Sequence, residues 1–156
     1  MKLYIVRHGQ AASSNVDPQR GLTQAGRAEV EKVAGFLKPL NISVDCVWHS
    51  GKARAEQTAE ILAEGMTVKE GVTAHAGLAP NDHVGPIRDE IESAGQDIMI
   101  VSHLPFVGIL TSLLLTGTQS GWLINFKEAT TACLEKQSNN TWQEQWVIGP
   151  GILKGD

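Results

Sequence analysis

Cysteine, long apolar runs and metal-binding spacings are scarce or missing in this chain. The only two cysteines, Cys46 and Cys133, lie in apolar segments, so we expect small buried side chains in a reducing compartment rather than a disulfide. Without a Cys-x-x-Cys or His-x-x-x-His spacing, no metal site is predicted. The apolar run before Arg7 is too short for a signal peptide, and residues 113–115 are too few to cross a membrane. These absences predict a cytoplasmic protein without a membrane or metal partner.

A surplus of basic residues is also missing. The 156 residues include 13 Lys and Arg against 17 Asp and Glu, which gives a net charge of −4. Proteins that bind nucleic acid or anionic membranes usually carry a basic surplus, so both partners are excluded, although one local basic pocket is still allowed. The length and a hydrophobic content of 42% are those of one folded domain, which we expect to span residues 1–156.

What the sequence does contain is an alternation of apolar strands and amphipathic helices. Strand patterns occupy residues 3–6, 44–48, 72–76, 98–101, 129–136 and 141–148. Helical patterns lie between residues 23 and 39, 50 and 65, and 82 and 95, and from 105 to about 115. This alternation predicts an α/β fold of three layers, α/β/α, with a mostly parallel central sheet. The last two strands are separated by a turn at residues 138–140, which predicts an antiparallel C-terminal edge.

Capping signals mark the ends of the predicted helices. Thr23, Ser50 and Asp82 each precede a helical pattern, and their side-chain oxygens are typical of N-caps. Gly95 follows the third helix, where a glycine commonly adopts the left-handed conformation that ends a helix. The sequence therefore predicts where the helices begin and end from local chemistry alone.

Cationic side chains follow three of the predicted strands. Arg7 and His8 come directly after the first strand, Arg54 opens the helix after the second, and His103 follows the strand at 98–101. Because the carboxyl ends of parallel strands meet at one edge of a sheet, we expect these side chains to lie close together. Arginine binds phosphate oxygens through paired donors, and a neutral histidine can attack phosphorus, so this set suits a phosphoryl group. Adjacent strand residues point to opposite faces, so the chain must bend at Gly9 for Arg7 and His8 to share a pocket.

Each of these residues also has a plain structural explanation. Arg7 alone could close a strand, Arg54 could lie on a helix surface, and His103 could cap the helix that follows it. Their joint placement favours a site, because it would otherwise require three independent coincidences. His49 also lies at a strand end, but the sequence does not assign it a role.

The segment Arg7-His8-Gly9 resembles the signature of the histidine phosphatase (phosphoglycerate mutase-like) superfamily. Further segments are similar to the pattern of that family in the same order, namely residues 22–26, Ser50 with residues 54–59, residues 78–80 and residues 101–105. The Arg-His-Gly-x-Ala and Ser-His-Leu-Pro forms, with the short chain, are similar to the SixA-type phosphohistidine phosphatase branch. The resemblance implies a phosphoglycerate mutase-like fold, hydrolase activity and no metal or organic cofactor.

The resemblance also implies roles for the matching residues. His8 would be the nucleophile that becomes phosphorylated, Arg7 and Arg54 would clamp the phosphoryl oxygens, and His103 would stabilise the transferring group. Water would then hydrolyse the phospho-His8 intermediate. The positions expected to bind the rest of the substrate are Gly9, where the backbone allows close approach, and Gln10, Asn15, Leu104 and Asp82.

An acid that protonates the leaving group, found in larger family members, has no clear counterpart here. Asp82 is the nearest candidate, with an alternative as a helix cap, and the direction of the Glu56 side chain is open. A phosphohistidine needs such an acid less, because imidazole leaves more readily than an alkoxide. We therefore expect a phosphatase for a phosphorylated protein, such as a histidine phosphotransfer domain of a signalling relay, with a pocket that a phosphate or sulfate ion also fits. The alternatives are a small-molecule phosphoester phosphatase and a non-catalytic phosphate-binding module.

Overall fold

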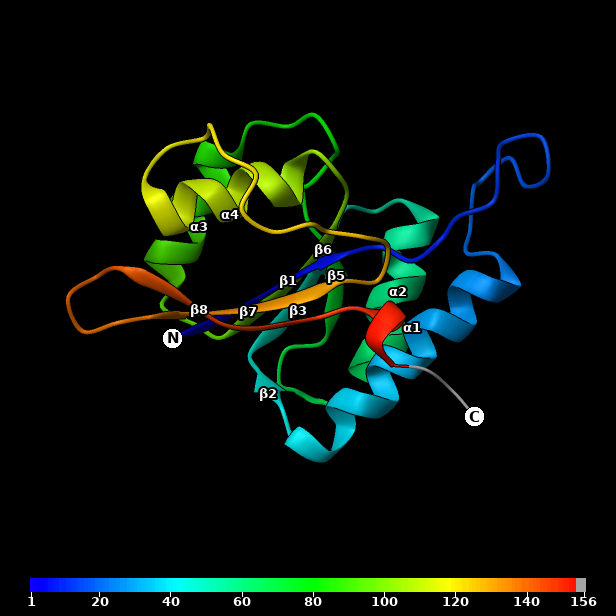
Figure 1. Ribbon diagram of the computed structural model, residues 1–156, viewed down its shortest axis with the longest axis horizontal. Helices are drawn as coiled ribbons and strands as arrows, with labels where there is room; N and C mark the ends of the chain where they lie inside the picture. The colour runs from blue at the N-terminus through cyan, green and yellow to red at the C-terminus, as the bar shows by residue number, and fades with distance from the viewer. Residues whose placement is uncertain (154–156) are drawn as a thin grey trace.

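A mixed β-sheet lies between two pairs of helices in the computed structural model, which describes residues 1–153 (Figure 1). The α-helices are α1 (Gln24–Leu37), α2 (Ala53–Ala63), α3 (Val84–Ala94) and α4 (Phe106–Thr116). The strands are β1 (Lys2–Arg7), β2 (Ser43–Val44), β3 (Cys46–His49), β4 (Thr67–Val68), β5 (Val72–Ala74), β6 (Ile98–Ser102), β7 (Thr131–Lys136) and β8 (Trp142–Ile148). Two short 3-10 helices, Lys38–Leu40 and Pro150–Ile152, follow α1 and β8.

The main sheet has six strands in the order β5-β3-β6-β1-β7-β8. The first four are parallel, and β7 and β8 are antiparallel to their neighbours at one edge. This arrangement confirms the predicted three-layer α/β/α fold with its antiparallel C-terminal edge. The carboxyl ends of β1, β6 and β3 therefore lie side by side, with Arg7 opposite Ser102 and His49 opposite Val101 in register.

Alternating side chains of the central strands build two separate cores, one on each face of the sheet. Leu3, Ile5 and Ile100 belong to the core under α3 and α4, whereas Val6 and Val101 belong to the core under α1 and α2 (Figure 1). Every residue of β6 is buried, as expected for a parallel strand that is covered on both faces. No helix of residues 1–153 is long and apolar enough to pass through a membrane.

The strand predicted at residues 44–48 is confirmed at residues 46–48 but is not continuous, because the chain there forms two strands in different sheets. Asp45 separates them: its Oδ2 accepts the Asp97 N–H at 2.8 Å, and its Oδ1 binds Lys69 Nζ at 3.0 Å. β2 pairs only with β4, and β3 joins the main sheet. The hydrophobic pattern alone predicts one continuous strand. The Asp45 side chain interrupts it by accepting a hydrogen bond from the backbone of another segment.

One of the three predicted N-caps is confirmed and two are wrong. The Thr23 hydroxyl accepts the Gly26 N–H at 2.9 Å at the start of α1. The helix α2 begins after Lys52 without a side-chain cap, because the Ser50 hydroxyl binds His103 instead. The helix α3 begins after His83, also without a side-chain cap, and Asp82 bonds elsewhere. Gly95 ends α3 in the left-handed conformation, as predicted, and both cysteines are free and buried.

Candidate functional site

Two buried histidines meet where the carboxyl ends of β1 and β6 lie side by side. His8 directly follows β1 and His103 directly follows β6, and their ring centroids are 4.8 Å apart at an interplanar angle of 55°. The bend that brings His8 here is fixed by its own backbone, because the His8 N–H donates to the Ser102 carbonyl at 3.0 Å. The parallel order of the sheet thus joins residues that are 95 positions apart in the chain.

The ring of His8 is held in one tautomer. Its Nδ1 lies 2.6 Å from the carbonyl oxygen of Gly9. A carbonyl oxygen only accepts, so Nδ1 carries the proton and Nε2 keeps its lone pair. Burial lowers the pKa of His8 from 6.5 to about 4, and the charges of Arg54 and Arg7 act in the same direction, opposed by the Gly9 carbonyl. At neutral pH, His8 is therefore a neutral imidazole with a free nucleophilic nitrogen.

The ring of His103 is oriented by Ser50. The Ser50 Oγ lies 2.6 Å from His103 Nε2, whereas Nδ1 is buried without a hydrogen-bond partner among residues 1–153. A proton on Nδ1 would leave a buried donor unsatisfied, so the proton belongs on Nε2, which donates to Ser50. Burial lowers the pKa of His103 from 6.5 to about 3, with smaller effects of His8 and nearby cations. His103 is thus a neutral donor beside a neutral acceptor.

Arg7 is fixed by the loop that leads into β7. Its Nη1 donates to the carbonyl oxygen of Phe126 at 2.9 Å, and its backbone N–H donates to the Thr130 carbonyl at 3.1 Å. Phe126 is itself part of the core under α3 and α4. The Nε of Arg7 is buried without a hydrogen bond, and Nη2 also makes none within the described chain, so Nη2 is left for a ligand.

Arg54 is tied through Thr58 to the loop that follows His8. The Thr58 Oγ1 donates to the Arg54 carbonyl at 2.7 Å and accepts the Gly9 N–H at 3.0 Å. This pair of bonds fixes the first turn of α2 against the residue that follows His8. The positive charge of Arg54 lowers the pKa of His8 more than that of Arg7 does. The sequence pattern did not assign this connecting role to Thr58, because only the folded chain brings Gly9 against α2.

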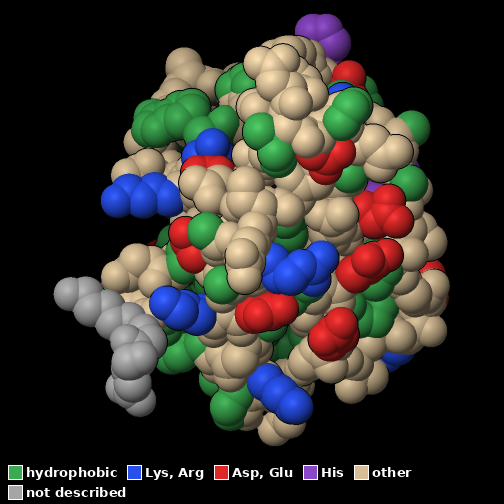
Figure 2. Space-filling view, turned by 90° about the vertical axis from the view of Figure 1, so that its right-hand side faces the viewer, with side chains coloured by type: hydrophobic (Ala, Val, Ile, Leu, Met, Phe, Trp, Pro, Cys, Tyr) green, Lys and Arg blue, Asp and Glu red, His purple; other side chains and the backbone are tan. Residues whose placement is uncertain are grey.

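The cations around the two histidines have no acidic partners. Arg7, Arg54, Arg20 and Lys52 all affect the pKa of His8 or His103. None of the four forms a salt bridge with any carboxylate of the described residues. Acidic and basic side chains both lie on the face toward which β1 points (Figure 2). The unpaired cations therefore form a local anion site on a protein whose surface is otherwise mixed in charge.

Arg20 was not predicted from the sequence. It lies in the loop after β1, in a segment rich in Ser, Asn, Asp and Pro that carries no strand-end signal. The loop is closed by the bridge between Ala11 and Leu22, which brings Arg20 back toward the histidines. A basic residue in a polar loop is common in any sequence, so only this closure marks it as part of the site.

The glycine and glutamine after His8 have structural tasks. A Cβ on Gly9 would lie 2.6 Å from Val30 Cγ2, so this glycine permits α1 to pack against the loop. The Gln10 Oε1 accepts the Thr23 hydroxyl at 2.8 Å. The backbone N–H of Gly9 is bonded to Thr58 and is not free for a ligand. The packing of α1 is therefore a second reason for glycine at this position, beside the predicted close approach of a substrate.

The other residues named in the sequence analysis differ in burial and in their hydrogen-bond partners. Leu104 is half-buried against the core, and Asn15 is exposed in the loop after β1. Asp82 is exposed, and its Oδ2 accepts the Ala79 N–H at 2.8 Å. His49 is buried, and its Nδ1 accepts the Gly51 N–H at 3.1 Å. The negative charge of Glu56 raises the pKa of His49, against the larger lowering effect of burial.

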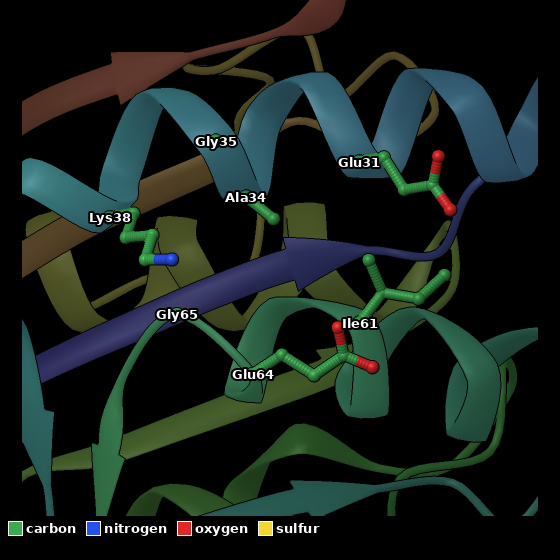
Figure 3. A pocket seen from close by; sticks show the side chains of 7 residues that line it. All are labelled: Glu31, Ala34, Gly35, Lys38, Ile61, Glu64 and Gly65. Carbon is green, nitrogen blue, oxygen red and sulfur yellow. The ribbon is translucent and has the colours of Figure 1, made fainter.

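A separate hollow lies on the outer side of α1 and α2 (Figure 3). Its charged lining consists of Glu31, Lys38 and Glu64, and it contains neither histidine of the site. Acidic and basic groups of this kind offset one another, so the hollow lacks the unpaired positive charge found around His8.

Comparison with known proteins identifies the family. A model of the histidine phosphatase superfamily (branch 1) matches residues 3–79. An uncharacterized protein of Picosynechococcus sp. (strain ATCC 27264 / PCC 7002 / PR-6) is 33% identical over 136 residues, which cover 83% of this chain and 81% of that protein. The chain belongs to the histidine phosphatase superfamily. It is accordingly a phosphatase.

The similarity to SixA-type members of this superfamily extends over the whole chain. The phosphohistidine phosphatase SixA of Escherichia coli (strain K12) is 28% identical over 159 residues, covering 99% of this chain and 97% of SixA. The structure of the protein histidine phosphatase SixA complexed with tungstate superposes with a TM-score of 0.86 at 28% identity, covering 99% and 100% of the two chains. The predicted SixA-type membership and phosphoglycerate mutase-like fold are thus confirmed.

The buried histidines of this phosphatase predict a stability that depends on pH. Between pH 6.5 and about 4 an unfolded histidine binds a proton, whereas folded His8 remains neutral, so stability is present above pH 6.5 and is lost as the pH falls. We expect the free energy of unfolding, measured with urea, to fall between pH 7 and pH 4.5 by about 1–2 kcal/mol more in the wild type than in His8→Gln. An equal fall in both proteins would contradict the lowered pKa of His8.

Proposed function

We propose that this protein is a phosphohistidine phosphatase that removes the phosphoryl group from a phosphorylated protein through a covalent phospho-His8 intermediate. The observation that carries this proposal is the hydrogen bond from His8 Nδ1 to the Gly9 carbonyl at 2.6 Å, which leaves Nε2 unprotonated among cations that have no acidic partner within residues 1–153. We further propose that the whole chain acts as one histidine phosphatase domain.

In the first step, His8 Nε2 attacks the phosphorus atom of the substrate. The new Nε2–P bond forms as the P–N bond of the substrate phosphohistidine breaks, and the bonding electrons leave with the substrate imidazole. Arg7 and Arg54 bind the phosphoryl oxygens, and the Nε2–H of His103, which donates to Ser50 in the free protein, donates to one of these oxygens once substrate is bound. Because His8 and His103 are neutral, the net charge that stabilises the transferring group comes from the arginines.

In the second step, water attacks the phosphorus of phospho-His8. The Nε2–P bond breaks, inorganic phosphate leaves, and His8 recovers its lone pair. The bond from Nδ1 to Gly9 keeps the ring in place during both steps, so the same nitrogen is presented in each cycle. Phe126 holds the guanidinium of Arg7 through one hydrogen bond, and Thr58 holds the backbone of Arg54 against the residue after His8.

The charge pattern of the site supports an N–P bond in the substrate. The neighbouring arginines and Lys52 lower the pKa of His8 or His103, and Asp82 uses one carboxylate oxygen on its own turn. An alkoxide leaving group requires a proton donor, whereas a substrate imidazole can leave already protonated. The similarity over the full chain to proteins named phosphohistidine phosphatase supports the same substrate class. A histidine phosphotransfer domain of a signalling relay is the kind of protein partner that we propose.

The proposal is tested by the substrate preference. Phosphohistidine protein, free phosphohistidine, a sugar phosphate and a nucleotide would be compared at equal concentration by phosphate release. We expect kcat/KM to be highest for the phosphohistidine protein. Dominant turnover of the esters, lost in Asp82→Asn, would instead support a small-molecule phosphoester phosphatase and overturn the proposal.

A further inference from the structure

Arg20 is held in a conformation that its sequence does not favour. Its φ is 52°, in the left-handed region that residues other than glycine rarely adopt. The strain is maintained by the loop: the Arg20 N–H donates to the Asp17 carbonyl at 2.9 Å, and Nε donates to the Ala12 carbonyl at 3.1 Å. Asp17 also accepts the Gly21 N–H at 2.9 Å. Strained residues that a loop maintains in this way are concentrated at functional sites.

The hydrogen bond to Ala12 uses only one of the five donors of this guanidinium. Both Nη groups of Arg20 are without a hydrogen bond to any residue from 1 to 153, and no carboxylate of that range forms a salt bridge with it. The charge nevertheless acts on His8, His103 and Arg54, lowering the pKa of each. Within residues 1–153, the Nη donors of Arg20 are therefore free to bind a group from outside the chain.

Lys52 lies on a second side of the same site. Its backbone N–H lies 3.4 Å from the Ser50 Oγ that binds His103, and its charge acts on His103. Both Lys52 and Arg20 are exposed, whereas Arg7 and Arg54 are partly buried. Arg7 and Arg54 can therefore bind the phosphoryl group itself. Arg20 and Lys52 lie where they can bind substrate groups around it.

We propose that Arg20 and Lys52 form a cationic rim that binds carboxylates adjacent to the phosphohistidine of a protein substrate. This inference rests on the proposed function and names the chemistry of the partner, namely acidic side chains flanking the phosphorylated residue. The protein as a whole carries a charge of −4, so an acidic partner is attracted by a local group of cations such as this rim and not by the net charge. Rim charges of this kind act mainly on the rate of association and on partner choice.

The test uses two phosphohistidine peptides that differ only in their flanking residues, glutamine in one and glutamate in the other. We expect the wild type to show a higher kcat/KM for the glutamate peptide, with an advantage that shrinks as salt is raised. Arg20→Gln should lower kcat/KM for the glutamate peptide about fivefold more than for the glutamine peptide. Lys52→Gln should change the ratio in the same direction, and Arg27→Gln, an exposed arginine of α1, should leave it unchanged.

Each outcome separates this inference from the proposed function. A wild type that prefers neither peptide overturns the proposed rim. An Arg20→Gln variant that loses activity equally on both peptides also overturns it, and would place Arg20 at the phosphoryl group. Lys52→Gln lies outside the strained loop and keeps the test valid if Arg20→Gln fails to fold. A wild type that hydrolyses neither peptide overturns the proposed function itself.

Discussion

Replacing His8 by alanine is expected to lower kcat for phosphohistidine hydrolysis on the order of 10⁴-fold or more. The reason is that no other group offers an unprotonated nitrogen at the same point: the Nε2 of His103 carries a proton that is donated to Ser50. The arginines would remain in place, because their partners are Phe126 and Thr58 rather than His8. Substrate binding should therefore be weakened much less than turnover, and the comparison of kcat with KM checks this.

The matched control for this variant is His83→Ala. His83 is exposed at the start of α3, makes no side-chain cap, and should be replaced without loss of activity. Thermal unfolding followed by circular dichroism shows whether His8→Ala remains folded. A folded His8→Ala protein with wild-type kcat would show that His8 is not the nucleophile.

Replacing Gly26 by alanine is expected to destabilise the protein by about 2–3 kcal/mol, although alanine favours helices more than glycine does. A Cβ at this position of α1 would fall on the carbonyl oxygen of Gln10, closer than a Cβ atom approaches a backbone oxygen. Backbone atoms cannot rotate away as a flexible side chain can, so α1 must move from the loop that follows His8. Urea unfolding measures the loss, and reduced kcat should accompany it.

A second glycine of the same helix provides the control. Gly35 has no atom within 4 Å of the Cβ that alanine would add, so Gly35→Ala should stabilise the protein by about 0.5–1 kcal/mol. Opposite signs for the two substitutions would show that contact with Gln10, and not helix propensity, controls the first. Equal stabilisation by both would contradict the close packing of α1 against the loop that follows His8.

The fold and the centre of the site could be predicted because they depend on regular features of the chain. Fully apolar runs such as residues 98–101 indicate buried parallel strands, and parallel strands place their carboxyl ends at one edge. That geometric rule is sufficient to predict from the sequence alone that His8 and His103 lie together, as their ring contact confirms. The chemical roles predicted for these histidines came from the segments that resemble the family pattern.

What could not be predicted are contacts that compete with local signals. Ser50 and Asp82 both have side chains suited to helix caps, but each finds another partner once the chain folds, His103 for the first and Ala79 for the second. Asp45 likewise bonds across to residue 97 and divides a run that reads as one strand. Local propensity is a weak preference, and a hydrogen bond to a distant residue overrides it.

Arg20 illustrates a different limit of sequence reasoning. Neither spacing nor periodicity distinguishes an arginine in a polar loop from any surface cation. Its significance depends on loop closure, on a left-handed backbone and on the absence of an acidic partner within residues 1–153. These are properties of three-dimensional arrangement, and for this reason the outer part of the site is visible only in the folded chain.

The most direct test of the account is the location of the phosphoryl group during turnover. The wild-type enzyme would be mixed rapidly with a phosphohistidine protein, quenched at alkaline pH and analysed by intact mass spectrometry, followed by NMR to identify the modified nitrogen. Because Nδ1 of His8 is bonded to the Gly9 carbonyl, the account predicts one phosphoryl group, on Nε2 of His8. A phosphoryl group on Nδ1 or on another residue, or turnover with no phosphoenzyme at any time, would contradict it.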